Sequence, residues 1–478
     1  MPDLGVYVNE TATASAGLSA AESGIPYVVG TAPLHTAKKP APVGVPVVCG
    51  SWDEAVEKLG YSEDWQKYTL CEVMYNHFKL YSCRTVIFCN MLDPAKSKTE
   101  AASAGYPVAE HKAILPYETL LPGLTVKADA GTEAPALEEG TDYSVFYDES
   151  AGACVVELLE DGTAYAAQNL TVESVQVKPS AVTAADIAKG IAQVDACLNR
   201  TGVTPDLLLA PGWSEYPVIA ALLAVEAGSV STLLRAKALV DIDSTPAGVT
   251  DPGDLAEYKE KQGLTLRNQI LCWPMVTKAG KRFHLSTQLC GLMSQVDREN
   301  GGVPYDSPAG HNLLIDGCCL ADGTEISLTF DQVNRVAGYQ GIVTALYFGL
   351  NGWQAKGNYT ACYPRNKDVK DCFIPNARMF TWVGNTLVKN FWQKLDRPMT
   401  RRLADDIIDG VNQWLNGLQG SGYIYGGRVS YEASENPLTD LLEGIIKFHI
   451  YLATPSPAQK IVFTLEYDLD YVTAALAG

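Results

Sequence analysis

Apolar positions recur with a helical period in the last quarter of the chain. From Asn376 to Leu395 they form one broad stripe, which predicts an amphipathic helix that Pro398 ends. Thr400 stands where it would cap a second helix of the same kind, and the turn from Gly420 to Gly422 would end it. Two adjacent amphipathic helices are therefore expected here.

A strand, a short helix and a final pair of strands are expected next: Tyr423 to Glu432, Leu438 to Leu442, Ile445 to Ala453 and Lys460 to Leu469. In the last strand, apolar side chains alternate with more polar ones: Ile461, Phe463, Leu465 and Tyr467. This period of two predicts a strand with one buried and one mostly solvated face.

Strand and helix patterns alternate upstream, in two stretches. The clearest unit is a buried strand, a helix and a second strand: Asp206 to Ala210, Glu215 to Ala227 and Ala236 to Ile242. Such a unit predicts a parallel strand pair with a right-handed crossover. We therefore expect an α/β core built from residues 21–115 and 181–365.

Residues 116–180 have a different pattern, because short strand-like pieces are separated by Gly, Asp and Glu turns. The pattern predicts a small β domain inserted into the core. Residues 128–161 hold ten acidic residues and no Lys or Arg. Calcium-loop spacing is absent, so a solvated acidic face is the favoured interpretation.

The N-terminal stretch predicts one strand, followed by a weakly hydrophobic linker. Gly5, Val6, Tyr7, Val8, Asn9 and Glu10 form the strand, and small residues from Thr11 to Ala21 follow it. Two interpretations stay open: the strand pairs within its own domain, or it pairs with the sheet edge of another chain.

Composition limits the function further. The 478 residues carry a net charge of −19, which argues against a nucleic-acid binder. No apolar run approaches the roughly 20 residues of a membrane span. The first residues have neither a basic flank nor an apolar segment, so we expect no signal peptide and synthesis in the cytoplasm.

Catalytic motifs are missing where an α/β chain would carry them. The loop from Pro211 to Tyr216 matches neither GxSxG nor GxGxxG, and no phosphate-binding loop occurs. The six histidines and twelve cysteines show no metal-ligand spacing, so we interpret them as structural side chains. A convergence of His284, Asp316 and Ser214 has no support in the sequence. We expect no catalytic residue, no cofactor and no metal.

Several motifs resemble the tail sheath proteins of contractile-tailed phages and contractile bacteriocins. The densest lie between residues 340 and 470: GNYTACYP from Gly357, DCFIP from Asp371, MFTWVGNTL from Met379, FWQK from Phe391, WLNGL from Trp414 and GGRV from Gly426. The start PDLGVYVNE, from Pro2 to Glu10, is similar too. The resemblance touches most of the chain and is weak in residues 116–180.

The resemblance implies a structural subunit that forms stacked, usually hexameric, rings around a tail tube and contracts to drive the tube through an envelope. Arms of neighbouring subunits would add strands to the sheet of a C-terminal domain. The implied fold is a multidomain α+β chain with five parts: an arm (1–20), the α/β core, the inserted β domain, a C-terminal domain (366–469) and a linking tail (470–478). The strand residues Gly5–Glu10 and the apolar residues of the last strand would make the exchanged strands.

Partners implied by the resemblance are other copies of this chain, the tube protein, and baseplate and terminator proteins, first in the bacterial cytoplasm and then in the tail. The segment from Asn376 to Arg402 holds six basic residues and one acidic residue, a net charge of +5. Its members Lys389, Lys394, Arg397, Arg401 and Arg402 are candidates for contact with an acidic tube or neighbour. A surface helix balanced by Asp405 and Asp406 is the alternative.

Two other functions are kept open. The sheath of a headless bacteriocin or injection system would have the same subunit physics. An α/β enzyme whose site converges only in three dimensions is the rival from another class.

Overall fold

The computed structural model describes residues 18–128 and 135–477. Its largest sheet has eight strands in the order β18-β17-β12-β11-β10-β1-β3-β2. The strands are β1 (Pro26–Gly30), β2 (Val47–Cys49), β3 (Val86–Asn90), β10 (Leu207–Leu209), β11 (Lys237–Asp241), β12 (Gln269–Cys272), β17 (Ile342–Tyr347) and β18 (Trp353–Lys356). The inner strands run parallel, whereas β2 and β18 are antiparallel edges.

Helices link and cover these strands: α1 (Trp52–Leu59), α2 (Thr69–Met74) with a π-helical turn (Tyr75–Leu80), α3 (Ala184–Ala192), α4 (Cys197–Thr201), α5 (Pro217–Gly228), α6 (Leu255–Lys261), α7 (Leu285–Glu299), and α8 (Phe330–Val333) with a second π-helical turn (Asn334–Tyr339). Helix α5 connects β10 to the adjacent parallel strand β11, so the predicted parallel pair is confirmed. Thr183 caps α3 with a capping box, in which its side chain accepts from the Asp186 amide and the Asp186 side chain accepts from the Thr183 amide.

A four-stranded antiparallel sheet flanks this core, in the order β14-β13-β15-β16. Its strands are β13 (Met275–Lys278), β14 (Lys281–Phe283), β15 (Gly317–Cys319) and β16 (Glu325–Ile326). Strand β13 follows β12 almost directly in the chain, but the two strands belong to different sheets.

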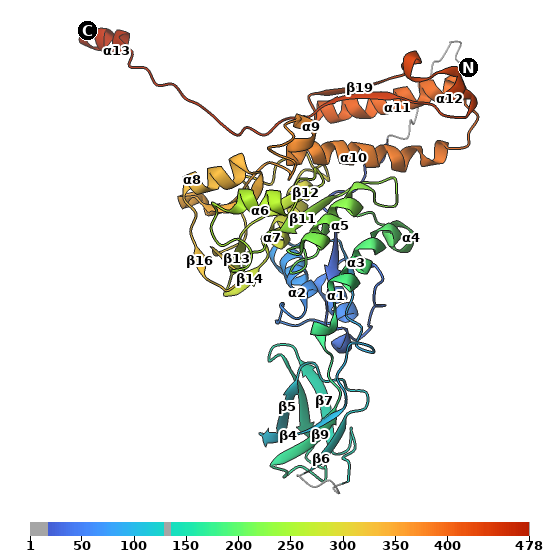
Figure 1. Cartoon of the computed structure of the whole chain (residues 1–478), viewed down its shortest axis with the longest axis vertical. Coiled ribbons are helices and arrows are strands. Elements are labelled where there is room, and N and C mark those ends of the chain that lie inside the picture. The colour runs from blue at the N-terminus through green and yellow to red at the C-terminus, as the bar shows by residue number, and fades with distance from the viewer. Residues whose placement is uncertain (1–17, 129–134, 478) are drawn as a thin grey trace, which may run out of the picture.

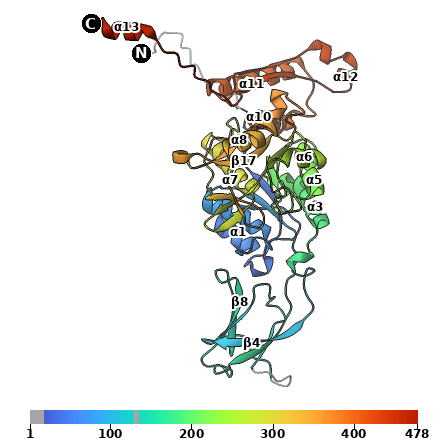
Figure 2. The same cartoon turned by 60° about the vertical axis from the view of Figure 1, so that its left-hand side comes forward.

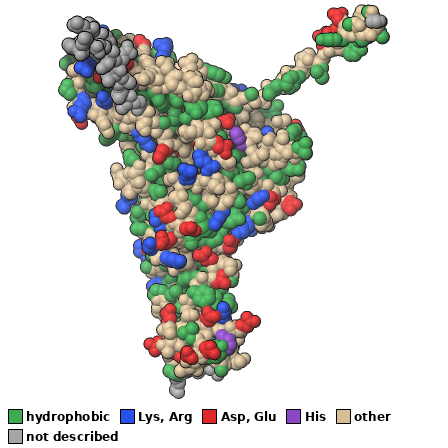
Figure 3. All heavy atoms as spheres, turned by 180° about the vertical axis from the view of Figure 1, so that it is seen from behind, with side chains coloured by type: hydrophobic (Ala, Val, Ile, Leu, Met, Phe, Trp, Pro, Cys, Tyr) green, Lys and Arg blue, Asp and Glu red, His purple; other side chains and the backbone are tan. Residues whose placement is uncertain are grey.

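A third sheet stands apart from the core at the lower end of the molecule (Figures 1 and 2). It is antiparallel, with six strands in the order β6-β9-β4-β5-β8-β7 and a hydrophobic cluster of its own. The strands are β4 (Ala102–Ala109), β5 (Lys112–Pro116), β6 (Thr125–Ala128), β7 (Tyr143–Asp148), β8 (Ala153–Leu158) and β9 (Asn169–Ser174). It includes β4 and β5, which precede the boundary expected at residue 116. Acidic side chains are prominent over this part of the surface (Figure 3).

The C-terminal part lies at the opposite end of the molecule (Figure 1). It contains α9 (Val369–Cys372), α10 (Ile374–Phe391), α11 (Arg401–Gly420), β19 (Gly426–Ser430), α12 (Leu438–Leu442) and β20 (His449–Ala453). Helices α10 and α11 and the β19–β20 pair share one hydrophobic cluster, with Trp382, Leu415 and Val429 inside it. The two amphipathic helices expected from the sequence are both present, and Thr400 caps α11 by accepting the Leu403 amide.

The expected pairing of Ile445–Ala453 with Lys460–Leu469 is wrong. Strand β20 pairs with β19, and residues 454–468 have no regular structure. The tail forms a helix, α13 (Leu469–Leu476), which the Asp468 side chain caps. The expected buried face is absent because no strand of the described chain pairs with this segment, although its alternating pattern suits a sheet.

Candidate functional site

The C-terminal arm, residues 460–477, projects away from the body of the molecule (Figures 1 and 2). Two polar contacts hold its base, because the Tyr359 hydroxyl donates to the Gln459 carboxamide and the Asn376 carboxamide nitrogen contacts the Ser456 hydroxyl. Beyond Gln459, the alternating apolar side chains are almost fully exposed, with Phe463 at 85% and Leu465 at 95%. Such a row of exposed apolar side chains is characteristic of a segment that is covered by a partner.

The β19–β20 pair is the second open element at this end. In the described part of the chain each strand has only one neighbour, so backbone groups along the sheet edges have no strand partner. Asn412 covers part of the β19 edge, since its carboxamide accepts the Val429 amide proton at 2.8 Å. A two-stranded sheet is marginal alone, and here α11 supports it.

The predicted N-terminal strand, from Gly5 to Glu10, lies outside the described residues. The chain becomes describable at Leu18, beside α10. Asn390 exchanges hydrogen bonds with the Ser19 backbone, and the Trp382 indole donates to the Ala21 carbonyl at 2.7 Å. The N-terminal segment is therefore attached to α10, which shares a hydrophobic cluster with α11 and the β19–β20 sheet.

The basic segment separates into two groups in the structure. Lys394, Arg397, Arg401 and Arg402 are exposed at the turn between α10 and α11, and Lys389 is half-buried on α10. Within the +5 segment, Arg378 does not belong to this surface. It is 3% exposed and bonds to Asp297 and Asp206, because it joins α10 to the α/β core.

A cavity of about 630 Å³ lies in the core rather than at either end. It opens beside Gly212 and Thr69, just past the carboxyl ends of β10 and β1, where the strand order of the large sheet reverses. Ligands of open α/β sheets usually bind at this topological position. The cavity is therefore the place where an enzyme of this fold would have its site.

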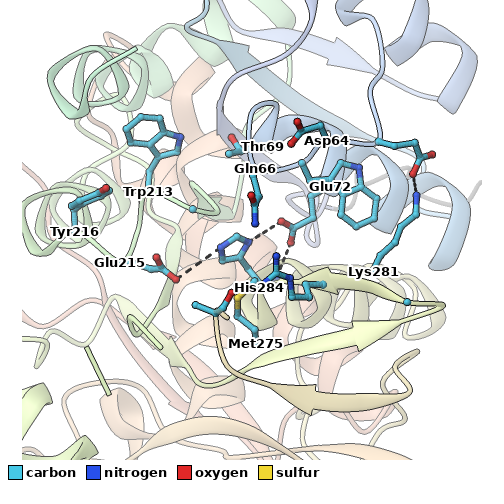
Figure 4. A pocket seen from close by; sticks show the side chains of 16 residues that line it. Asp64, Gln66, Thr69, Glu72, Trp213, Glu215, Tyr216, Met275, Lys281 and His284 are labelled. Carbon is cyan, nitrogen blue, oxygen red and sulfur yellow. Dashed lines mark hydrogen bonds and ion pairs between the residues drawn. The ribbon is translucent and has the colours of Figure 1, made fainter. Parts of the chain in front are cut away.

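His284 is the central polar group of this cavity (Figure 4). Its Nδ1 lies 2.8 Å from Glu72 Oε2, and its backbone amide donates to Glu72 Oε1. Its Nε2 lies 3.9 Å from Glu215 Oε1, on the loop after β10. One imidazole thus bridges two carboxylates from distant parts of the chain.

The electrostatics of the cavity do not suit base catalysis. Burial alone lowers the pKa of His284, but the Glu72 carboxylate, with Asp241 and Glu215 farther away, raises it to about 10. The imidazole is therefore protonated at neutral pH and has no free nitrogen to accept a proton. Burial raises the pKa of Glu215 to about 7, and a neighbouring protonated histidine only partly opposes this.

The three residues considered for convergence do not meet. The Ser214 hydroxyl donates to Asp241 Oδ2 at 3.1 Å, whereas Asp316 pairs with Lys278 on the four-stranded sheet. No group of three metal-ligating side chains occurs among residues 18–128 and 135–477. All twelve cysteines are free and buried. None of these observations supports a catalytic mechanism.

Sequence reasoning missed the Glu72–His284–Glu215 cluster. The sequence did contain a usable signal for two carboxylates near this site. Glu215 lies in the loop after β10 and Asp241 is the last residue of β11, and the carboxyl ends of these parallel strands meet at one edge of the sheet. Glu72 gave no signal, since it lies inside an otherwise apolar helix.

No helix in the described part of the chain is long and apolar enough to span a membrane.

Comparison of the sequence with known proteins finds relatives among phage tail sheath proteins. The chain is 26% identical over 99% of its length to the tail sheath protein of Burkholderia phage BcepMu, of which 98% is covered. It is 24% identical to the tail sheath protein of Escherichia phage P2, over 65% of this chain and 75% of that protein. No family model matches.

Solved structures of contractile particles have the same fold. The helical sheath of the anti-feeding prophage in its contracted state matches with a TM-score of 0.56 at 14% identity, covering 97% of this chain and 99% of that one. The contracted sheath of the PVC extracellular contractile injection system matches with a TM-score of 0.56 at 13% identity, covering 98% and 99%.

The relatives are tail sheath proteins, and the structures that share the fold are subunits of contractile sheaths. The resemblance to contractile tail sheath proteins drawn from the sequence is confirmed. These relatives are structural proteins.

Proposed function

We propose that this chain polymerises as stacked helical rings, hexameric in each layer, around a tail tube, and that contraction of the stack drives the tube through the envelope of a target cell. The observation that carries the proposal is the C-terminal arm. It carries a strand-like alternation of exposed apolar residues and ends far from the sheet of its own chain. Donation of this segment to another subunit would bury its apolar face and satisfy its backbone.

The exchanged strand is assigned to Ile461, Phe463, Leu465 and Tyr467, with the N-terminal strand Gly5–Glu10 as a second donor. The acceptor is the β19–β20 sheet of a neighbouring subunit. Main-chain hydrogen bonds would carry most of this contact and tolerate rotation between subunits. Residues 454–460 link β20 to the exchanged strand, and these seven residues span up to roughly 25 Å when extended.

The chain divides into an arm (1–20), an α/β core (21–115 and 181–365), an inserted β domain (116–180), a C-terminal domain (366–469) and a tail (470–478). The pairing of β4 and β5 with β8 and β9 favours an earlier start for the inserted domain, near Ala102. Its acidic residues would form a solvated outer face. The exposed basic turn between α10 and α11 would contact the tube or a neighbouring subunit, and the ends of the stack would meet baseplate and terminator proteins.

A headless contractile particle is the second candidate for the assembly. The similarity of the fold to the anti-feeding prophage and PVC sheaths favours it, whereas the curated relatives come from phages. Genes for a capsid and a packaging motor beside the gene for this chain would decide for a phage. In either case assembly would take place in the bacterial cytoplasm.

The arm assignment is tested by two substitutions that place the same charge on opposite faces of the arm. Phe463→Asp should abolish striated tubes in negative-stain microscopy of purified protein, because a carboxylate would enter the buried face of the donated strand. Thr464→Asp, on the solvated face, should leave tubes intact. Both chains should remain folded by circular dichroism. Equal assembly of the two variants would contradict the assignment.

A further inference from the structure

Helix α5 has an apolar outer face that its own chain leaves open. Val218 and Val225 are 74% and 62% exposed, Ala221 is exposed, and Leu222 is half-buried. These four residues recur at the spacing of one helix face. The opposite face, including Ile219 and Leu223, packs in the core.

The sequence of α5 is apolar on almost all sides, PVIAALLAVEAG, with Glu226 as its one charged residue. A helix that is apolar all round is typical of a fully buried helix, whereas a surface helix normally carries charges on its outer side. The outer face of α5 therefore has the composition of a covered surface.

A second apolar patch lies on the side of the core near α8. We call it the aromatic tip and define it as Phe330, Tyr347, Phe348 and Leu350. Phe330 and Phe348 meet edge to face at 5.7 Å, and Leu350, in the turn before β18, is fully exposed. The charged residues of α8 and its π-helical turn, Asp331 and Arg335, pair with each other, so they leave the patch without a net charge.

The two patches lie on opposite sides of the core. In both ribbon views α8 is at the left of the core and α5 at its right (Figures 1 and 2). One chain that carries two different apolar patches on opposite sides can join its copies head to tail, and such contacts close into rings or continue as helices.

We propose that the outer face of α5 docks on the aromatic tip of a neighbouring copy of this chain. The partner is a second copy of this chain, because each patch needs an uncharged apolar surface to bury it. The outer face of α5 on one copy and the aromatic tip of the next copy meet this need, and the same contact can repeat from copy to copy. This contact rests on the proposed function, since it requires a polymer. The α5 contact would join the α/β cores of neighbouring subunits directly, in addition to the links made by the exchanged N-terminal and C-terminal strands.

Cysteine cross-linking tests the contact in assembled full-length protein. Chains with Val225→Cys and chains with Phe348→Cys are mixed, assembled and treated with a short bismaleimide. The native thiols should not react with the bismaleimide, because all twelve are buried. Covalent dimers are expected from the mixture only, since a head-to-tail contact brings different residues together. A mixture of Val225→Cys with Ile114→Cys, which is exposed on the six-stranded sheet, is the matched control.

A second measurement follows the concentration needed for assembly. Val218→Asp should raise it at least about tenfold, because a carboxylate would be buried without a partner. Ile114→Asp should leave it unchanged. Tubes that form normally but give no more dimer than the control mixture would overturn the α5 contact alone. A wild-type chain that stays monomeric at every concentration would overturn the proposed function, and the contact with it.

Discussion

Arg378 offers the sharpest test of how the C-terminal part is held to the core. Its guanidinium donates from Nη1 to Asp297 Oδ1 at 2.9 Å and from Nη2 to Asp206 Oδ2 at 2.7 Å. Arg378 and Asp297 are 3% and 1% exposed. Replacing Arg378 by Met retains most of the apolar stem but leaves the Asp297 carboxylate buried without its counter-charge.

Breaking a buried ion pair from one side costs about 3–5 kcal/mol, much more than the net value of the intact pair. We therefore expect Arg378→Met to lower the free energy of unfolding by about that amount. Asp297→Asn in the same chain should recover part of the loss, because it removes the uncompensated charge. Arg335→Met is the matched control, since Arg335 forms an exposed pair with Asp331 and its loss should cost less than about 1 kcal/mol.

Urea unfolding of each variant, followed by circular dichroism, measures these differences. The deficit of Arg378→Met should be smaller at pH 5 than at pH 8. Without its arginine, the buried carboxyl would have a raised pKa in the folded state, so its cost grows as the pH rises. A loss below about 1 kcal/mol, or no recovery with Asp297→Asn, would refute the reasoning.

Three further outcomes are expected. Gly60→Ala should cost about 2–3 kcal/mol more than Gly202→Ala in thermal unfolding, because both glycines have positive φ but only at Gly60 would the new Cβ collide with the Pro33 carbonyl. Glu215→Gln should raise the free energy of unfolding by about 1–3 kcal/mol at pH 8 and by less than about 1 kcal/mol at pH 5. The reason is that the raised pKa of Glu215, about 7 against an ordinary 4.5, makes the folded state lose stability as pH rises through that interval. Charge reversal of Arg401 and Arg402 together should weaken co-sedimentation with purified cognate tubes several-fold at low salt, since exposed charge contacts are individually weak. Arg200→Glu on α4 should not, and equal binding by both variants at low salt would remove the basic turn from the interface.

Local signals in the sequence were sufficient for much of the fold. Thr400 marked a helix start that the structure confirms, because a capping side chain bonds within its own turn. The parallel pair β10–β11 followed from one strand–helix–strand unit. These features depend on residues close together in the chain, so their spacing is enough to predict them.

Features that depend on distant residues were not predictable in this way. Arg378 was counted with a basic surface, but its partner Asp206 lies 172 residues away and makes it a core residue. The cavity cluster joins Glu72 to His284 across 212 residues. The last predicted strand was wrong for another reason: its side chains do alternate, but among the described residues this segment pairs with no strand.

The burial of every cysteine has a consequence for the sheath proposed above. Burial raises the pKa of thiols such as Cys318, to about 12, so they remain protonated and unreactive. A polymer of this chain therefore presents no thiol to an oxidising medium. In the proposed sheath, neighbouring copies would therefore not become linked by disulfide bonds, and the subunits would remain free to move past one another during contraction.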